Sequence, residues 1–329
     1  MGLVFLELAS HWLVPIPAGT QFLGPDGRTI DVLADPLRLA PNIEFRQNSP
    51  DFDVLGRTGP LGLRQPEPRG APEIIFLGDS FTFGQGLGDD ETIPALYCAG
   101  QTFVCANLGR PGSGQHSQSR ILEDRIVHDG WRPKEVKLLI FAMADSIMAG
   151  NDFLDTQIEV ENERRAVAGE AGVGRNRGEA TIEAEGGGML LGPLLQHRRW
   201  VLAHSNLARI AYVQLGPILR SWFAPASRVA RLDEGIVAVS NEVERIRSLG
   251  DRYGFGLTIY VIHPVQDLMR GTYNNTRLAV VRAAGGVTLV DTAPALLDRP
   301  RAYYFPYDGH LNATGAKLVA AFLRQADGR

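Results

Sequence analysis

The sequence predicts a three-layer α/β domain built on a parallel sheet, and two observations support this fold class. Continuous apolar runs such as EIIFLG, residues 73–78, lack the alternation of a half-exposed strand and are typical of strands buried on both faces. These runs alternate with amphipathic segments such as residues 113–130, where Ile121, Leu122 and Ile126 have helical spacing. Strand and helix alternating along one chain favour a parallel sheet covered by helices.

The elements follow from the same two patterns. We expect five strands, near residues 74–77, 102–106, 137–142, 257–262 and 287–290. Between and after them we expect helices at 91–100, 113–130, 234–254, 274–286 and 313–326. Pro94 falls in the first turn of its helix, where proline is tolerated. No internal repeat interrupts this order, so we expect a single α/β domain with additions.

One addition precedes the predicted domain of residues 73–329, and two further segments interrupt it. Residues 1–72 form an N-terminal extension that is rich in proline and glycine, with loops and short strands. Residues 155–190 are charged, glycine-rich and poor in large apolar side chains, which predicts a flexible insertion, with a charged surface hairpin as the alternative. Residues 191–225 have a helical pattern and are expected either to cap the sheet or to face a membrane.

The first residues, MGLVFLELASHWLVPIP, leave the compartment undecided. A spanning helix needs about 20 apolar residues, and this run ends at Pro15 and contains Glu7 and His11. It also lacks the basic start of a signal peptide. We interpret it as an amphipathic helix packed on the domain or as the stub of a membrane anchor, in a protein that is exported or anchored. Peripheral membrane contact through residues 1–15 is a further hypothesis.

Composition excludes several classes of function. The chain has 329 residues with 33 basic and 37 acidic side chains, and no basic stripe of a nucleic-acid-binding protein is visible. The glycine-rich stretch GQGLGDD, which begins at residue 84, lacks the lysine of a phosphate-binding loop, so we expect no such loop there. Cys98 and Cys105 are too few for a zinc site. A disulfide between them is conceivable, but we favour two small buried side chains.

Polar residues follow the predicted strands, where a parallel sheet binds its ligands. They are Ser80 after the first strand, Asn107, Gly109 and Gly112 after the second, Asp145, Asn151 and Asp152 after the third, His263 after the fourth, and Asp308 with His310 before the last helix. Positions distant in the sequence thus meet at one edge of the sheet.

Three of these residues have the chemistry of a nucleophile and its activating groups. A serine hydroxyl needs a base within hydrogen-bond reach, and that base needs an orienting carboxylate. His310 can be the base for Ser80, and Asp308 can hold its other nitrogen. The developing oxyanion would take hydrogen bonds from the Ser80 and Gly112 N–H groups and an asparagine side chain. The alternatives are Ser80 as a plain helix cap and residues 308–310 as a plain loop.

The segments FLGDSFTFGQG, NLGRPGSG, GND and DGHLN resemble the four signature blocks of the SGNH (GDSL-type) serine hydrolase superfamily. The resemblance covers residues 73 to about 155 and 235 to 325. It implies a flavodoxin-like α/β/α sandwich of about five parallel strands. It also implies serine ester hydrolysis, or acyl transfer with the same residues, without a metal or cofactor.

Carried over residue by residue, the resemblance implies Ser80 as the nucleophile, His310 as the general base, Asp308 as its orienting acid and Gly112 as an oxyanion donor. The spacing of Asp308 and His310 departs from the D-x-x-H of many lipolytic members. It is similar to the D-x-H form of branches that act on acylated glycans, including polysaccharide O-acetyltransferases. Among small-molecule and glycan esters, this favours an O-acylated sugar as the substrate.

The third block departs most from the family pattern. Ala144 and Asp145 stand where the family has its asparagine, and Asn151 comes six residues later. With a loop insertion, Asn151 completes the oxyanion hole; in strict register, Ala144 replaces it and activity is weak or lost. Three hypotheses follow: a serine esterase, an O-acyltransferase, and a glycan-binding protein without activity.

Three other polar residues are expected to have structural roles. Asp79 is expected to fix the turn at Ser80 by bonding backbone N–H groups. Asn107 is expected to bond the backbone of its loop, and His263 to be a satisfied histidine beside a proline turn.

Overall fold

The computed structural model describes residues 6–7, 9–10, 21–28, 30–33, 35, 37–142, 205, 207 and 225–329. The chain divides into two compact units, one of residues 1–19 and 159–225 and one of residues 20–158 and 226–329. In the first unit, the Glu7 carboxylate accepts hydrogen bonds from the Ser205 hydroxyl and the Leu207 N–H. The predictions for residues 155–190, and nearly all of those for 1–15 and 191–225, lie outside the described residues. The second unit contains the sheet and is described from here on.

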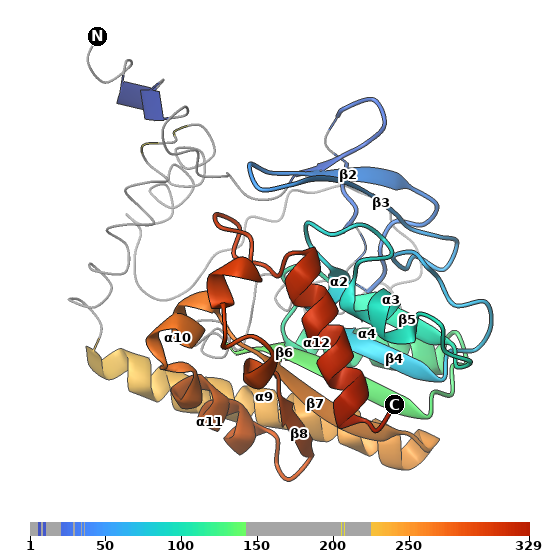
Figure 1. Ribbon diagram of the computed structural model, residues 1–329. Helices are drawn as coiled ribbons and strands as arrows, with labels where there is room; N and C mark the ends of the chain where they lie inside the picture. Colours follow the sequence, from blue (N-terminus) through green and yellow to red (C-terminus); the bar gives the residue numbers. More distant parts are fainter. Residues whose placement is uncertain are drawn as a thin grey trace, which may run out of the picture. The chain divides into compact units, whose positions relative to one another are not determined.

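The second unit is built on a five-stranded parallel sheet, as predicted (Figure 1). Its strands are β4 (Ile74–Gly78), β5 (Cys105–Gly109), β6 (Glu135–Phe141), β7 (Gly256–Ile262) and β8 (Thr288–Asp291). Their order in space is β5-β4-β6-β7-β8, and every neighbouring pair is parallel. This is the flavodoxin-like order, in which the winding direction reverses beside the first strand of the sheet. The end of β4 is therefore the expected place for a ligand.

Helices cover both faces, which confirms the three-layer α/β prediction (Figure 1). One face packs against α4 (Gln115–Val127), α9 (Pro225–Tyr253) and α11 (Tyr273–Ala283). The other packs against α2 (Ser80–Phe83), α3 (Ile93–Cys98), α10 (Val265–Arg270) and α12 (Ala313–Ala326). Short 3₁₀ turns lie at Ala293–Ala295 and Pro300–Ala302. Successive strand side chains serve opposite faces: Ile75 and Leu77 pack in one layer, Phe76 in the other.

The second strand lies three residues later than predicted. Residues 102–106 were expected to form it, whereas pairing with β4 places it at 105–109, with Ile74 opposite Cys105 and Gly78 opposite Gly109. Asn107 is therefore inside the strand and not after it. Its side chain donates to the Thr82 carbonyl at 3.0 Å and accepts from the Gly109 N–H at 2.9 Å, so a polar residue is satisfied in a buried strand.

Residues 21–57 form a small antiparallel sheet of β1 (Gln21–Leu23), β2 (Glu44–Asn48) and β3 (Asp53–Arg57). Asn48 pairs with Asp53, so the β2–β3 hairpin closes through residues 49–52. The rings of Phe22, Phe45 and Phe83 pack together and join this sheet to the helix after β4.

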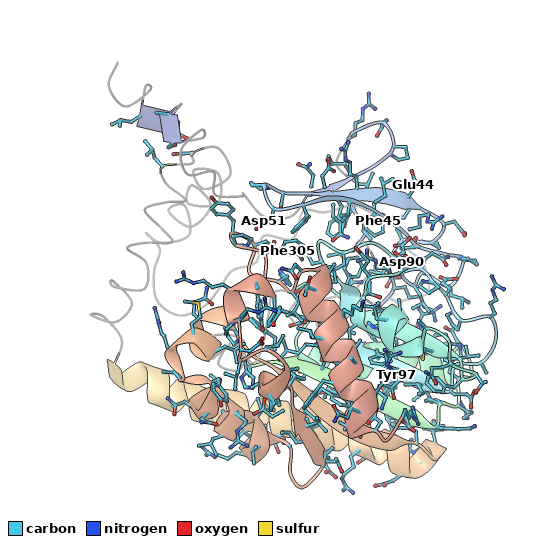
Figure 2. All side chains as sticks on the ribbon, in the orientation of Figure 1. Glu44, Phe45, Asp51, Asp90, Tyr97 and Phe305 are labelled. Carbon is cyan, nitrogen blue, oxygen red and sulfur yellow. A yellow bond between two sulfur atoms is a disulfide. The ribbon has the colours of Figure 1, made fainter. Side chains whose placement is uncertain are left out.

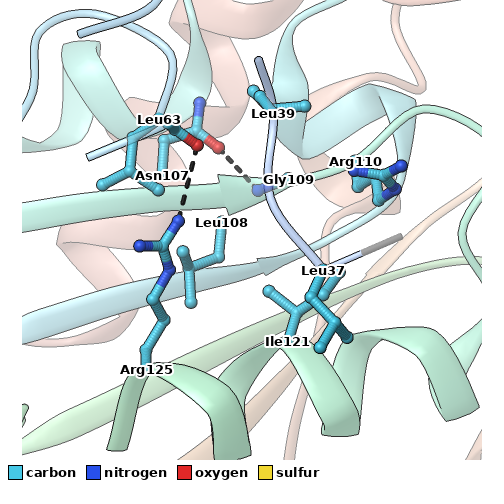
Figure 3. A pocket seen from close by; sticks show the side chains of 10 residues that line it. Leu37, Leu39, Leu63, Asn107, Leu108, Gly109, Arg110, Ile121 and Arg125 are labelled. Atoms are coloured by element: carbon cyan, nitrogen blue, oxygen red, sulfur yellow. Dashed lines mark hydrogen bonds between the residues drawn. The ribbon is translucent and has the colours of Figure 1, made fainter. Parts of the chain in front are cut away.

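Arg110, which directly follows β5, connects the sheet to the segment around residues 33 and 37–39. The buried Arg110 guanidinium donates to the carbonyl oxygens of Leu33 and Arg38. The Arg38 guanidinium in turn bonds Asp124 and Asp129. A cavity of about 10 Å³ remains beneath this segment, between β5 and α4 (Figure 3). It has room for about one water molecule, so the segment is closely packed on the sheet.

Cys98 and Cys105 form a disulfide, which corrects the favoured interpretation of two separate buried side chains. The bond joins the end of α3 to the start of β5 across a sequence separation of seven residues. The later start of β5 puts Cys105 at the first position of the strand, where its Cα is 6.4 Å from that of Cys98. This spacing lies within the range that a disulfide spans.

Candidate active site

Ser80 is the second residue after the end of β4 and the first residue of α2. Asp79 is the helix cap: its carboxylate accepts the N–H of Phe81 at 2.9 Å. Asp79 therefore fixes the turn by bonding the backbone, as predicted, and Ser80 itself is not the cap. Ser80 remains partly exposed, whereas Phe81 and the rest of α2 are buried.

Gly109 lets this turn lie close against the neighbouring strand. A Cβ on Gly109 would come within 2.1 Å of the Phe83 nitrogen. Any side chain at position 109 would therefore displace α2 and with it Ser80. A glycine of the second signature segment thus serves packing at the turn.

Asp308 and His310 lie in a tight loop before α12. The Phe305 N–H donates to the His310 carbonyl at 2.8 Å, and the Gly309 N–H donates back to the Phe305 carbonyl at 3.1 Å. Gly309 has a φ of 82°, a conformation that favours glycine. This loop turns the Asp308 carboxylate back onto the ring of His310.

The three side chains form one chain of hydrogen bonds. Ser80 Oγ lies 2.6 Å from His310 Nε2, and His310 Nδ1 lies 2.5 Å from Asp308 Oδ1. A carboxylate at Nδ1 holds the ring proton there, so Nε2 is left to accept the proton of the serine hydroxyl. The side chain of His310 is 17% exposed and that of Asp308 is 7% exposed. The structure thus brings Ser80, His310 and Asp308 together with the order of contacts that serine activation needs.

The charges around His310 are negative. Burial by itself would raise the pKa of Asp308, but the hydrogen bond and charge of His310 and the hydrogen bond from Gln85 outweigh burial and hold this pKa below its usual value. Asp308 is therefore ionised at neutral pH and can stabilise an imidazolium. Burial of the Asp79 carboxyl group raises its pKa to about 6, although the residue as a whole is partly exposed.

The loop that carries Gly112 is tied to the end of β4. The Gly78 carbonyl accepts the Arg110 N–H at 3.0 Å and the Ser113 hydroxyl at 3.2 Å. Gly112 itself is exposed and has a φ of 73°. The Ser80 N–H begins a helix and so has no acceptor within it. Two N–H groups of the predicted oxyanion hole thus belong to segments joined at Gly78.

The remaining predicted residues divide into two groups. Asn151, the predicted third oxyanion donor, lies outside the described residues, as do Ala144, Asp145 and Asp152. His263 is fully buried, with Nε2 2.8 Å from Asp291 Oδ1 and its carbonyl accepting the Tyr304 hydroxyl. It is held in the core as expected, but only Nε2 is satisfied, because the described residues offer no hydrogen-bond partner to the buried Nδ1.

Two contacts of the site could not be read from the sequence. Gln85 Nε2 donates to Asp308 Oδ2 at 3.0 Å, so the second carboxylate oxygen is also held. The Phe81 ring lies 4.6 Å from the His310 ring and stacks on Phe141. The GDSFTFGQG segment contains both Phe81 and Gln85, but no periodicity or spacing assigns them a partner.

The described residues contain no group of three or more His, Cys, Asp or Glu side chains that could hold a metal ion. No helix in this part of the chain is long and apolar enough to cross a membrane.

Comparisons with known proteins give distant structural matches. No model of a known protein family matches the chain, and no curated protein does either. Among solved structures, the chain is similar to a catalytic mutant of an acetylxylan esterase from Geobacillus stearothermophilus, with 14% identity, a TM-score of 0.42, and coverage of 79% of this chain and 95% of that one. The chain is also similar to an α/β hydrolase from the Lake Arreo metagenome, with 14% identity, a TM-score of 0.41, and coverage of 79% of this chain and 95% of that one.

A protein titled as belonging to the G-D-S-L lipolytic family, from Desulfitobacterium hafniense, gives 12% identity, a TM-score of 0.39, and coverage of 77% and 97%. These identities and TM-scores are too low to assign a function, so the assignment rests on the residues of this chain.

Proposed function

We propose that this chain is a serine esterase of the SGNH hydrolase type, which cleaves carboxylic esters through an acyl-serine intermediate. The observation that carries the proposal is the continuous hydrogen-bonded chain from Ser80 through His310 to Asp308. Its position supports the same function, because Ser80 follows β4 at the point where the winding of the sheet reverses.

The first half of the reaction transfers the acyl group to the protein. Ser80 Oγ attacks the ester carbonyl while its proton passes to His310 Nε2, and the ionised Asp308 stabilises the imidazolium. The N–H groups of Ser80 and Gly112 would bond the oxyanion. When the carbon–oxygen bond to the alcohol breaks, His310 returns the proton to the leaving alcohol.

The second half releases the acyl group to an acceptor. A water molecule gives a proton to His310 and attacks the acyl carbonyl. The bond to Ser80 Oγ then breaks, His310 returns the proton to Ser80 Oγ, and a carboxylic acid is released. A sugar hydroxyl in place of water would make the same residues an O-acyltransferase. The one-residue spacing between Asp308 and His310 supports an acylated glycan or a small acyl ester, such as an acetyl ester, as the substrate.

The test is hydrolysis of p-nitrophenyl acetate by the purified chain, with and without an added glycan acceptor. We expect a burst of nitrophenol and steady turnover, both lost in Ser80→Ala. The matched control is Ser248→Ala, which removes an exposed hydroxyl on α9 and should leave the rate unchanged. Equal turnover by Ser80→Ala and the unchanged chain would rule out this function. Faster transfer to the glycan than to water would identify an acyltransferase.

Asn151 remains our proposed third oxyanion donor. Loss of one such donor typically lowers kcat by about 10²–10³. We therefore expect Asn151→Ala to reduce the rate of acylation of Ser80 by that factor. An unchanged rate would show that the site works with its backbone donors or with another side chain.

The compartment is a separate proposal. Disulfides persist mainly in oxidising compartments, and the Cys98–Cys105 bond supports an exported or anchored protein. Alkylation of thiols in freshly lysed cells tests this proposal, because an exported chain should resist alkylation until it is reduced.

A further inference from the structure

The turn of the β2–β3 hairpin contacts the loop that carries Asp308 and His310. Asp51 Oδ2 accepts the N–H of Tyr307 at 2.8 Å and the N–H of Asp308 at 2.6 Å. Figure 2 labels Asp51 and also Phe305, which belongs to the loop that Asp51 bonds. One carboxylate oxygen thus fixes two consecutive peptide groups, and the second belongs to the residue that orients His310.

The same hairpin also contacts the segment that follows Ser80. The Phe52 and Phe305 rings lie 4.9 Å apart, and a Cβ on Gly86 would come within 2.7 Å of both rings. The Gly86 N–H donates to Gln47 Oε1 at 3.1 Å, and Gln47 is fully buried. The hairpin therefore holds both segments that meet in the site.

Asp308 is held from two directions as a result. Its backbone N–H is fixed by Asp51, and its Oδ2 is fixed by Gln85, the neighbour of Gly86. The Gln85 segment is itself anchored, because the buried Arg64 guanidinium donates to the carbonyl oxygens of Phe83, Gly84 and Leu87. A carboxylate held at both its backbone and its free oxygen has little freedom to turn away from His310.

We propose that the β2–β3 hairpin is a positioning element of the active site, with Asp51 as its positioning residue. The inference rests on the proposed function, because positioning is useful only if Ser80, His310 and Asp308 react. Asp51 contacts the backbone of Tyr307 and Asp308 and acts through Asp308. Asp51, which precedes the first strand of the parallel sheet in the sequence, thereby positions a residue that lies before its last helix.

The hairpin supplies its own control. Asp53 lies two residues after Asp51 and pairs with Arg46 across the two strands of the hairpin, on its exposed surface. Asp53→Ala should therefore reproduce the loss of a hairpin carboxylate without touching residues 305–310. Asp51→Asn keeps an oxygen that can accept both N–H groups and serves as the conservative variant.

The first measurement is steady-state hydrolysis of p-nitrophenyl acetate by the full chain and by the variants Asp51→Ala, Asp51→Asn and Asp53→Ala. A misplacement of reacting groups by about 1 Å can cost about 100-fold in rate. We expect Asp51→Ala to lower kcat by about 10- to 100-fold with KM little changed, Asp51→Asn to recover most of the rate, and Asp53→Ala to match the unchanged chain. Equal kcat in Asp51→Ala and Asp53→Ala would overturn the proposal.

The second measurement needs no activity. Hydrogen–deuterium exchange of a peptide spanning residues 303–312 reports the N–H groups of Tyr307 and Asp308 directly. We expect faster exchange in Asp51→Ala and unchanged exchange in Asp53→Ala. Unchanged exchange in both would contradict the positioning contact.

The two measurements separate the two proposals. If the unchanged chain shows no Ser80-dependent hydrolysis, the proposed function fails, and the catalytic role of Asp51 is overturned with it. If hydrolysis depends on Ser80 but not on Asp51, only the positioning role is overturned.

Discussion

The two ends of α12 carry two acid–base clusters of similar composition and different consequence. Asp308 and His310 precede the N-terminus of the helix, and Asp327 caps its C-terminus. Each cluster pairs a carboxylate with a nitrogen base: Asp308 with His310 and Asp327 with the buried Lys137. Both carboxylates have a pKa below the usual value, because hydrogen bonds to the charged form outweigh the opposing effect of burial.

The difference lies in where the hydrogen bonds end. Asp327 accepts from Lys137 at 2.7 Å and from the hydroxyls of Tyr97 and Tyr260 at 2.6 Å each. Both tyrosines have a raised pKa, chiefly because of burial and then because of Asp327. This network ends in groups that keep their protons.

The other network ends at the partly exposed hydroxyl of Ser80, with the accepting nitrogen of His310 against it. The Asp308–His310 pair is therefore reactive because its network ends at the Ser80 hydroxyl. The Asp327–Lys137 pair, which is bonded by two tyrosines, instead anchors the C-terminal end of α12.

The largest effect should come from Asp308→Asn. An amide in place of the carboxylate no longer fixes the proton on His310 Nδ1, and the comparable change in a serine protease triad lowers kcat by about 10⁴. We expect a loss of about 10³–10⁴ in kcat/KM for p-nitrophenyl acetate and an almost unchanged Tm. A loss below tenfold would mean that Asp308 does not orient the base.

The opposite result is expected at the other end, for Asp327→Ala. Removing one partner of a buried ion pair costs about 3–5 kcal/mol. Lys137 keeps a contact with Glu135, so we expect a loss of about 3 kcal/mol in the free energy of unfolding, measured in urea. The kcat/KM of the folded variant should stay unchanged. Reduced kcat/KM with full stability would break the division between the two ends.

This cluster should also control acid stability. The pKa of Asp327 is lowered in the folded protein, so its contribution is complete above the unfolded value of about 3.9 and is lost as the pH falls through the folded value. The loss of stability below about pH 5 should therefore be shallower in Asp327→Ala than in the unchanged chain. Urea unfolding between pH 3 and pH 7 measures the difference.

The features that the sequence could predict are those with a local signal. Ser80 and the Asp308–His310 pair lie in short local motifs next to a strand end and a helix start, so their meeting follows from the fold class. The apolar runs that predict buried strands are local as well, and they located four of the five strands closely. The exception is β5, where pairing with β4 and the satisfied side chain of Asn107 set the limits.

The contacts that support the site have no such local signal. Asp51 bonds the backbone N–H groups of Tyr307 and Asp308 more than 250 residues away, and any sequence at those two positions except proline would offer the same donors. Gln85 and Arg64 likewise bond groups brought near by folding. Such contacts depend on tertiary structure alone, so composition and periodicity could not predict them.

The Cys98–Cys105 bond lies beside Tyr97 and should behave like the anchoring end of the molecule. Closing a loop of this length stabilises a fold by about 2.5 kcal/mol in the chain-entropy model. We expect the double variant Cys98→Ala, Cys105→Ala to lose about that much stability in urea, with kcat/KM unchanged. A marked loss of kcat/KM at full stability would instead connect the disulfide to Ser80.

The smallest effect, and one of opposite sign, is expected for Asp79→Asn. Burial raises the pKa of Asp79 to about 6, above the unfolded value of about 3.9. Its contribution to stability is therefore full below about pH 4, declines as the pH rises to 6, and stays reduced above that pH. Asn can still accept the Phe81 N–H as a cap but carries no charge to bury. We expect the two proteins to be equally stable at pH 4. At pH 8 we expect the Asn variant to be more stable by about 1 kcal/mol, since part exposure reduces the effect.

Urea unfolding at pH 4 and pH 8 measures this difference in stability. A gain at pH 8 would mean that the charge of Asp79 lowers the stability of the turn that carries Ser80, whereas the charge of Asp327 raises stability at the C-terminus of α12. A loss at pH 8 would mean that both charges stabilise the fold.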